Sequence, residues 1–127
     1  MNILVVDDKQ SVLNALTDML TASGYNVQTA CNGLDAFEKS QQFSFDLFII
    51  DHLMPIMNGL QLSKNLRQQE KSAKTPILFI TTQDLESVSS LAEAPLFNAI
   101  LTKPINQEKL IDQILLLDNQ NIQRQSL

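Results

Sequence analysis

Three short runs of apolar residues constrain the fold of this chain more than any other feature of its sequence. They occupy positions 3–6, 47–50 and 77–80, and no polar residue interrupts them. An uninterrupted run of this length is typical of a strand buried on both faces, as in a parallel sheet covered by helices. Apolar residues at helical spacing follow each run, which predicts alternating strands and helices. The expected fold class is therefore α/β.

Five strand–helix pairs are expected, joined by short connections. The strands are predicted at residues 3–6, 25–31, 47–50, 77–80 and 97–102. The helices are predicted at residues 11–23, 34–41, 84–94 and 105–117, with a third helix that begins at Gly59. Gly24 is expected to end the first helix as its C′ glycine. Right-handed crossovers then predict a doubly wound five-stranded parallel sheet with helices on both faces.

Length and charge narrow the class of protein. With 127 residues, 44% of them hydrophobic, the chain is long enough for one domain, expected at residues 1–117. Residues 118–127 are polar and are expected to form a tail or the start of a linker, so the domain either stands alone or belongs to a longer protein. The 14 acidic residues exceed the 9 Lys and Arg residues, which argues against nucleic-acid binding. No apolar run approaches the ~20 residues of a membrane span, and a cytoplasmic protein is expected.

Polar residues directly follow four of the five expected strands. Asp7 and Asp8 come after the first strand, Asp51 after the third, Thr81 after the fourth and Lys103 after the fifth. The carboxyl ends of parallel strands meet at one edge of the sheet, where ligands bind in such folds. We therefore expect three carboxylates, a hydroxyl and an ammonium to converge on one rim of the sheet.

The residue types at this edge favour phosphoryl chemistry with a magnesium ion. Adjacent carboxylates repel each other unless a cation joins them, and an all-oxygen site suits Mg²⁺. With one Cys and one His, the chain cannot build a Cys/His zinc site or an internal disulfide. Lys103 would add a second cation beside a phosphoryl group. Asp51 is expected to be ionised at pH 7, because the usual pKa of a carboxyl group is about 4, and so to attack phosphorus without a general base.

Four motifs resemble the receiver domain of bacterial two-component response regulators of the chemotaxis type. They are V-V-D-D at residues 5–8, D-H-L-M-P-I-M-N-G at 51–59, I-T-T at 80–82 and T-K-P at 102–104. The resemblance covers residues 1–117 and is carried by the order and spacing of the motifs. It implies a flavodoxin-like fold with strand order 2-1-3-4-5. It also implies a signalling switch that accepts a phosphoryl group and changes its binding face.

The resemblance further implies a role for each site residue. Asp51 would be the phosphoacceptor, Lys103 would bind a phosphoryl oxygen, and Thr81 would hydrogen-bond the phosphorylated Asp51. Four residues would hold Mg²⁺, one of them through water: Asp7 (through water), Asp8, Asp51 and the backbone carbonyl of Leu53. The Lys103–Pro104 peptide is expected to be cis, as in the family.

The implied partners follow from the same family. The phosphoryl donor would be a phosphohistidine on a sensor histidine kinase or a histidine phosphotransfer protein, and an output domain or protein would receive the signal. One or two of Leu115, Leu116 and Leu117 are expected to be exposed, and the last helices could support a dimer. Catalysis is expected to be limited to phosphoryl transfer to Asp51 and slow self-dephosphorylation, because Leu53 offers attacking water no side-chain hydrogen bond.

Two departures from the family affect the expected switch. Ile100 stands where the family often has an aromatic residue that rotates inward on activation, and Ile105 replaces the Phe common after K-P. The aromatic switch is therefore missing at this position. Thr81 is expected to lead the conformational change, because phosphorylation adds charge and strong hydrogen-bond acceptors beside it. Gln83 alone is left to orient attacking water.

Several other residues are expected to be structural. His52 is predicted to point away from the site, because side chains alternate along a strand, and to be an ordinary loop residue. Cys31 is predicted to be a small buried hydrophobe. Basic residues at helical spacing predict a solvated stripe on the third helix, made of Lys64, Arg67, Lys71 and Lys74.

Three other functions fit parts of the pattern. A phosphatase of the haloacid dehalogenase type also uses Asp and Mg²⁺, but it needs a second Asp two residues after the nucleophile, where this chain has Leu53. A flavin carrier would need a Ser/Thr/Gly loop after the first strand, where Asp7 and Asp8 would repel the phosphate. A receiver-like interaction module with weak or absent switching stays open because of Ile100.

Overall fold

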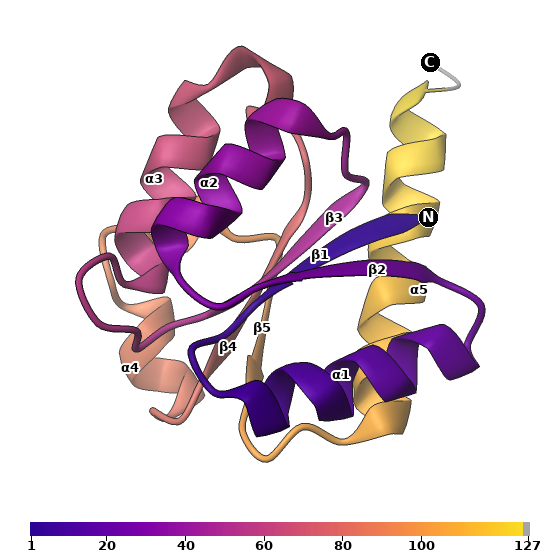
Figure 1. Cartoon of the computed structure of the whole chain (residues 1–127), viewed down its shortest axis with the longest axis horizontal. Coiled ribbons are helices and arrows are strands. Elements are labelled where there is room, and N and C mark those ends of the chain that lie inside the picture. Colours follow the sequence, from indigo (N-terminus) through magenta and orange to yellow (C-terminus); the bar gives the residue numbers. More distant parts are fainter. Residues whose placement is uncertain (126–127) are drawn as a thin grey trace.

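One five-stranded parallel sheet, in the order β2-β1-β3-β4-β5, forms the centre of the molecule (Figure 1). The strands are β1 (Asn2–Val6), β2 (Asn26–Ala30), β3 (Leu47–Asp51), β4 (Ile77–Thr81) and β5 (Ala99–Thr102). The computed structural model describes residues 1–125, with side chains for residues 1–119. The predicted fold class and strand order are confirmed.

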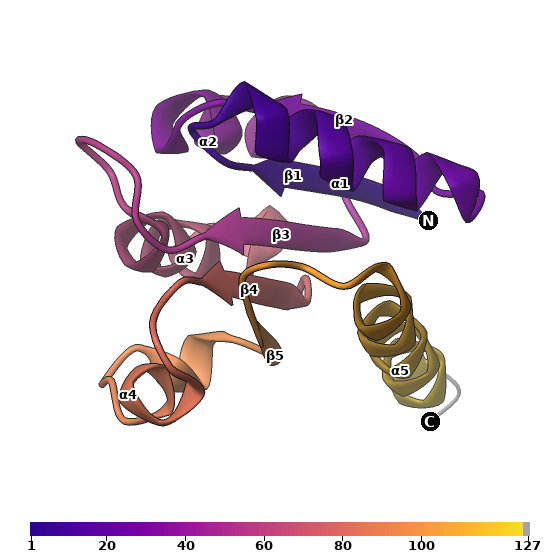
Figure 2. The ribbon, with the colours of Figure 1, turned by 90° about the horizontal axis from the view of Figure 1, so that it is seen from below.

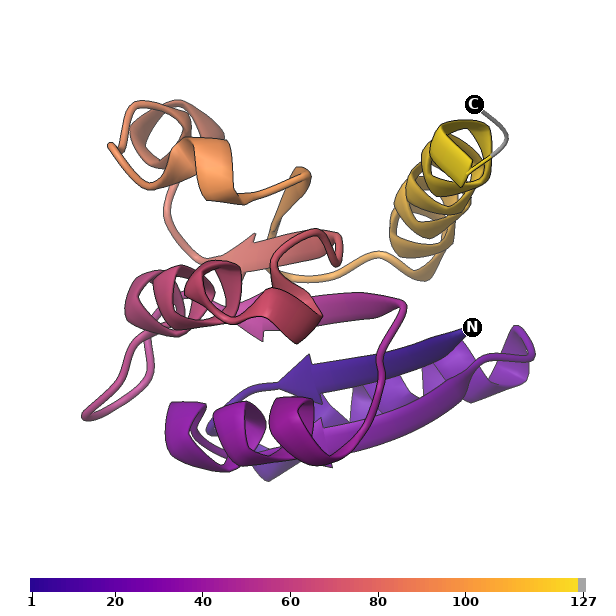
Figure 3. The ribbon, with the colours of Figure 1, turned by 90° about the horizontal axis from the view of Figure 1, so that it is seen from above.

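Helices connect successive strands and cover both faces of the sheet. They are α1 (Gln10–Ala22), α2 (Gly33–Gln42), α3 (Gly59–Gln68), α4 (Leu85–Ser89) and α5 (Gln107–Gln125), with the 3₁₀ helices η1 (Glu70–Ser72) and η2 (Ala94–Leu96). Helices α1 and α5 pack on one face, and α2, α3 and α4 on the other (Figures 2 and 3). Within residues 1–125, no helix combines the length and apolar character that a membrane crossing requires.

Alternation of side chains along the strands divides the core into two layers. Val5 and Ile49 belong to the layer under α1 and α5, whereas Leu4 and Ile50 belong to the layer under α2, α3 and α4. All five residues of β3 and all five of β4 are buried, as expected for central strands covered on both sides. The uninterrupted apolar runs of the sequence are therefore explained by two buried faces.

The first helix ends as the sequence predicts. Gly24 has a φ of 89°, a backbone conformation that glycine adopts without steric penalty. The N–H of Gly24 donates to the carbonyl of Thr21 at 3.0 Å, and the N–H of Tyr25 donates to that of Leu20 at 3.1 Å. This pair of bonds is the Schellman arrangement, which turns the chain directly into β2.

Two helices differ in length from the sequence-based expectation. Helix α4 covers only Leu85–Ser89 rather than 84–94, because Val88 is its one buried residue and the hydroxyls of Ser89 and Ser90 bond back to helix carbonyls. Helix α5 continues from Gln107 to Gln125 and passes the expected end at 117, since no Gly or Pro follows Leu117 to stop it. The assignment of residues 118–127 to a tail or linker stays a prediction.

The basic stripe predicted on α3 does not exist as such. Helix α3 ends at Gln68, so Lys71 lies in η1 and Lys74 in the following loop. Lys64 is exposed on α3, with its Nζ 4.0 Å from Glu93 Oε1. Arg67 is half-buried and is a structural residue rather than part of a solvated face.

Arg67 joins the end of α3 to the segment that leads into β5. Its guanidinium donates hydrogen bonds to five groups, which are the carbonyls of Leu96, Ser72, Ala73 and Thr75 and the Asn98 side-chain oxygen. Several donors in a rigid plane suit this task, whereas a lysine ammonium could satisfy only part of the set. The Arg67 side chain therefore donates hydrogen bonds to two separate segments, the one from the end of η1 to β4 and the one before β5.

The expectation that Cys31 is buried is wrong. Cys31 is exposed, because β2 ends at Ala30 and Cys31 lies in the turn before α2. Asn32 in the same turn caps α2 by accepting a hydrogen bond from the N–H of Asp35 at 2.8 Å. Leu115 and Leu116 are exposed while Leu117 is buried, as predicted for this triplet. The Lys103–Pro104 peptide is cis, also as predicted.

The substitution Arg67→Lys is expected to lower the free energy of unfolding by about 2 kcal/mol, because it keeps the charge but leaves several carbonyls without a donor. Urea denaturation monitored by circular dichroism measures this loss. Lys64→Ala, on the exposed face of the same helix, is the control and should change stability by less than about 0.5 kcal/mol. Equal effects of the two substitutions would contradict a structural role for Arg67.

Candidate functional site

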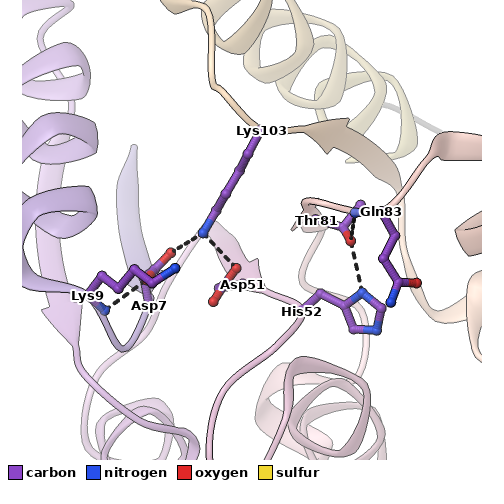
Figure 4. A network of polar contacts seen from close by, with 7 residues as sticks. All are labelled: Asp7, Lys9, Asp51, His52, Thr81, Gln83 and Lys103. Atoms are coloured by element: carbon purple, nitrogen blue, oxygen red, sulfur yellow. Dashed lines mark hydrogen bonds and ion pairs between the residues drawn. The ribbon is translucent and has the colours of Figure 1, made fainter.

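Three carboxylates and one ammonium meet at the C-terminal edge of the sheet. Figure 4 shows two of the carboxylates, Asp7 and Asp51, on either side of the Lys103 ammonium. The Nζ of Lys103 lies 3.0 Å from Asp7 Oδ2 and 2.9 Å from Asp51 Oδ1. One carboxylate oxygen from each of Asp7, Asp8 and Asp51 lies within 4.8 Å of the others. The structure thus brings together four of the residues expected at the site, and this acidic cluster could hold a metal ion.

Side-chain alternation determines which residues enter this cluster. Asp7, Asp51 and Lys103 each lie two positions after a strand residue of the layer under α1 and α5. Their side chains therefore project on the same face of the sheet, from β1, β3 and β5 in turn. Because β1 and β3 are neighbours in the sheet, the two aspartates meet without any distortion of the backbone.

The members of the cluster differ in exposure. Asp7 and Asp51 are 1% and 5% exposed, whereas Asp8 is exposed to solvent. Both oxygens of Asp7 are hydrogen-bonded, since Oδ1 accepts the backbone N–H of Lys9 at 2.9 Å and Oδ2 accepts from Lys103. Asp8 is consequently the carboxylate most open to a hydrated cation.

Burial and neighbouring charges shift the pKa values of Asp51 and Lys103, the ion pair at the centre of the cluster. Burial raises the pKa of Asp51, and the charges of Asp7 and Asp8 raise it further, while the Lys103 contact acts in the opposite direction. Burial alone would lower the pKa of Lys103, but Asp51 and Asp7 outweigh burial and raise it. Lys103 therefore stays charged at pH 7 and compensates the two carboxylates.

Thr81 lies at the expected edge of the sheet, at the end of β4, but its hydroxyl contacts His52 rather than a residue of the acidic cluster. It lies two positions after Phe79, in the series of β4 that faces α2, α3 and α4. Its Oγ1 is 2.9 Å from His52 Nδ1 and accepts the backbone N–H of Gln83 at 3.0 Å. The hydroxyl thus lies at the C-terminal edge of the sheet, like the carboxylates, but on the opposite face.

His52 points away from Asp51, as alternation predicts, but it is not an ordinary loop residue. It is 5% exposed, and its ring centroid lies 5.1 Å from that of Phe79. Burial lowers the pKa of His52, so the ring is neutral at pH 7. The register pairs Asp51 with Ile80, which makes His52 and Thr81 the next pair on the same face. Alternation applied to both residues would have predicted their contact.

Gly59 is a further residue whose importance the sequence analysis did not predict. A Cβ atom at this position would overlap the backbone oxygen of Asp51 and would lie 2.9 Å from the ring of Phe79. The Gly59 N–H donates to the backbone carbonyl of His52 at 2.8 Å. Glycine therefore lets α3 begin directly behind Asp51, and its fixed distance from Asp51 in the motif at 51–59 was the available signal.

Fold and site together define a class of protein: an α/β domain whose parallel strands carry an acidic cluster and a lysine suited to a cation and a phosphoryl group. More specifically, the chain belongs to the response regulator receiver domain family, whose model matches residues 3–115. Receiver domains are phosphorylation-dependent switches of two-component signal transduction, and they interact with histidine kinases and output domains. The predicted family and functional class are confirmed.

Sequence relatives include regulators of different lengths. The chain is 31% identical over 131 residues to the probable transcriptional regulator ycf29 of Porphyra purpurea, which covers 98% of this chain but only 63% of that protein. It is 32% identical over 112 residues to the protein PilH of Pseudomonas aeruginosa, covering 88% of this chain and 93% of PilH. The chain thus spans less than two thirds of one relative and nearly all of the other.

Solved structures of similar fold include chemotaxis and other response regulators. The chemotaxis response regulator CheY4 of Vibrio cholerae superposes with a TM-score of 0.85 at 34% identity, covering 91% of this chain and 97% of that one. The response regulator TrrA of Thermotoga maritima, solved in complex with Mg²⁺ and BeF, gives a TM-score of 0.84 at 28% identity with the same coverage of 91% and 97%.

The substitution Asp51→Asn is expected to raise the free energy of unfolding of the metal-free protein at pH 7. Because the pKa of Asp51 is raised in the folded state, its ionised form destabilises the fold, and a neutral amide removes this penalty. The gain should vanish as the pH falls below about 4, where the carboxyl group is protonated in both states.

Urea denaturation in EDTA at pH 7 and at low pH measures both parts of this expectation. Asp18→Asn, at an exposed position of α1, is the matched control and should show no comparable gain. A less stable Asp51→Asn protein at pH 7 would show that the ion pair with Lys103 outweighs the burial of Asp51.

Proposed function

We propose that the protein accepts a phosphoryl group on Asp51 and changes its binding face in response. The observation that carries this proposal is the contact of 2.9 Å between Lys103 Nζ and the nearly buried carboxylate of Asp51, beside two further carboxylates. A carboxylate needs no general base to attack phosphorus. An ammonium fixed beside it neutralises charge on the arriving phosphoryl oxygens, which is the main requirement for phosphoryl transfer.

The proposed donor is a phosphohistidine of a sensor histidine kinase or a histidine phosphotransfer protein. A carboxylate oxygen of Asp51 forms a bond to phosphorus while the phosphorus–nitrogen bond of the donor breaks. The electron pair of that bond stays on the imidazole nitrogen of the donor. The product on this chain is an acyl phosphate, and Lys103 would exchange its contact with Asp51 for one with a phosphoryl oxygen.

The acidic cluster fits Mg²⁺ as the cofactor of this reaction. It offers oxygen ligands only, from Asp7, Asp8 and Asp51, and the exposed Asp8 leaves room for bound water. We propose these residues, with the backbone carbonyl of Leu53, as the metal site. When bound, Mg²⁺ would neutralise the carboxylates and the phosphoryl oxygens. The complex of TrrA with Mg²⁺ and BeF supports this assignment.

An apolar groove beside Lys103 suits the docking of the phosphoryl donor. The groove is about 490 Å³ in volume and lies between α1 and the chain after Lys103. Its apolar lining includes Val12, Leu16, Met19 and Ile105. An amphipathic helix of the donor would cover these side chains and bring a histidine on its edge to the acidic cluster.

The main alternative is an interaction module with weak or absent switching. Two observations favour it, namely the bond of Thr81 to His52 rather than toward Asp51, and the half-buried Ile100 in place of an aromatic residue. Such a module would bind its partner equally well with and without phosphorylation. The following experiment separates the two functions.

Incubation with acetyl phosphate and Mg²⁺ is expected to add one phosphoryl group, seen by intact-protein mass spectrometry, and to shift amide signals in NMR spectra. Asp51→Asn should abolish both changes, because the amide oxygen is not a nucleophile of comparable strength. Phosphorylation without NMR shifts beyond the acidic cluster would support the interaction module. No phosphorylation of the wild type would exclude the proposed function.

The acyl phosphate is expected to decay slowly, because Leu53 is half exposed at the rim and cannot orient water, and the Gln83 side chain points toward His52 rather than toward Asp51 (Figure 4). Leu53→Asn should accelerate the decay several-fold by supplying a hydrogen bond to attacking water. The decay of phosphoprotein in Mg²⁺ buffer, followed by mass spectrometry, measures this rate. Leu53→Val is the control, and equal decay of the two variants would refute the role of an amide here.

A further inference from the structure

His52 and Thr81 form a polar contact in the layer under α2, α3 and α4, outside the acidic cluster. Thr81 is fully buried, His52 is 5% exposed, and His52 Nδ1 lies 2.9 Å from Thr81 Oγ1. They follow Asp51 and Ile80, the last register pair of β3 and β4. The proposed phosphoacceptor Asp51 and the partner of the hydroxyl, His52, are therefore consecutive residues at the end of β3.

The hydrogen atoms of this contact can be assigned by counting donors and acceptors. The backbone N–H of Gln83 already donates to Thr81 Oγ1 at 3.0 Å. Among the described residues, the only other hydrogen-bond partner of Oγ1 is His52 Nδ1. If His52 donated as well, the hydroxyl proton of a fully buried threonine would have no acceptor, which is costly. The hydroxyl therefore donates to Nδ1, and His52 carries its proton on Nε2.

The single proton of the Thr81 hydroxyl can serve only one acceptor at a time. A phosphoryl group on Asp51 would bring three strong acceptor oxygens to this edge of the sheet. For the hydroxyl to donate to one of them, its bond to His52 must break. His52 cannot follow the hydroxyl, because its ring packs against Phe79, whose ring is stacked on Phe97 with centroids 3.9 Å apart. Nδ1 would then lose its donor within a buried environment.

We propose that His52 is a positioning residue that holds the Thr81 hydroxyl away from Asp51 and so biases the protein toward its unphosphorylated conformation. This inference rests on the proposed function, because it assigns a competitor for the hydroxyl that would bind the phosphoryl group. The role of His52 follows from its contact with Thr81 and not from its position beside Asp51 in the sequence. The bias has the size of one hydrogen bond between neutral groups.

The pair His52→Asn and His52→Leu provides a matched test. Both side chains are smaller than histidine and have nearly the same shape, so both lose the contact with Phe79 to the same extent. Only asparagine keeps an acceptor at the position of Nδ1. Half-saturation by beryllofluoride with Mg²⁺, followed by NMR, should occur at an about tenfold lower concentration in His52→Leu than in His52→Asn, which corresponds to about 1.4 kcal/mol.

The same two substitutions in a Thr81→Val protein show whether the difference in beryllofluoride binding depends on the Thr81 hydroxyl. In Thr81→Val proteins, the Asn and Leu variants at position 52 should bind beryllofluoride equally, because no hydroxyl remains to be shared. Urea denaturation of all variants shows whether they fold. His52→Phe replaces the ring by another ring and takes the place of His52→Leu if that variant is unfolded. It should then bind tighter than the wild type.

The outcomes separate this inference from the proposed function. If the wild type binds no beryllofluoride under conditions where it is folded, the proposed function fails. If the wild type binds it and Asp51→Asn does not, but the Asn and Leu variants at position 52 bind equally, only the role of His52 fails. A difference between these variants that persists in the Thr81→Val background would also overturn it, because it would not depend on the hydroxyl.

Discussion

The contact of Lys103 with Asp7 and Asp51 is the interaction on which the geometry of the site depends. The register of the sheet places both carboxylates on one face, and Asp8 adds a third negative charge nearby. Without a cation, carboxylates at these distances would repel each other, and burial would increase the repulsion. The Lys103 ammonium compensates them from the end of β5, so one side chain joins the ends of three strands. A bound metal ion would relieve the same repulsion and leave Lys103 free to contact another anion.

Side-chain alternation separates the charges from the hydroxyl. Asp51 and His52 are consecutive, yet one faces the layer under α1 and α5 and the other the layer under α2, α3 and α4. A shift of the β3 register by one residue would exchange these two side chains and remove Asp51 from the acidic cluster. The buried apolar residues on both faces of β3 prevent such a shift. The same hydrophobic pattern that specifies the sheet therefore also specifies which residues meet at its edge.

The sequence was sufficient for the sheet but not for every helix or side chain. Strands buried on both faces have a short apolar run bounded by polar or turn residues, so β1, β3 and β4 were predictable within a residue or two. A similar run at residues 114–117 lies inside α5, where the helical spacing of the residues before it identifies the helix. Helix α4 was not, because its serines compete with the helix for backbone carbonyls. The half-buried position of Arg67 depends on loops distant in sequence, and no local periodicity encodes such contacts. For Thr81 the information was present, since alternation places it with His52.

Ile100, which replaces the aromatic residue that the family often has, lies close to three aromatic rings. Ile100 is half-buried in the layer that also contains His52, Phe79 and Phe97, and these three rings pack in succession from the end of β3 to the start of β5. Packing alone does not couple distant sites. Coupling requires an element with two arrangements, and events at both sites must change the equilibrium between them. In our proposal the His52–Thr81 bond is such an element, made in the unphosphorylated protein and broken when the hydroxyl donates to a phosphoryl oxygen. The rings next to it fix His52, while Thr81 is the last residue of β4 and precedes a loop. We therefore propose that in this chain the imidazole of His52, through its bond to Thr81, controls the switch in place of a rotating aromatic side chain at position 100.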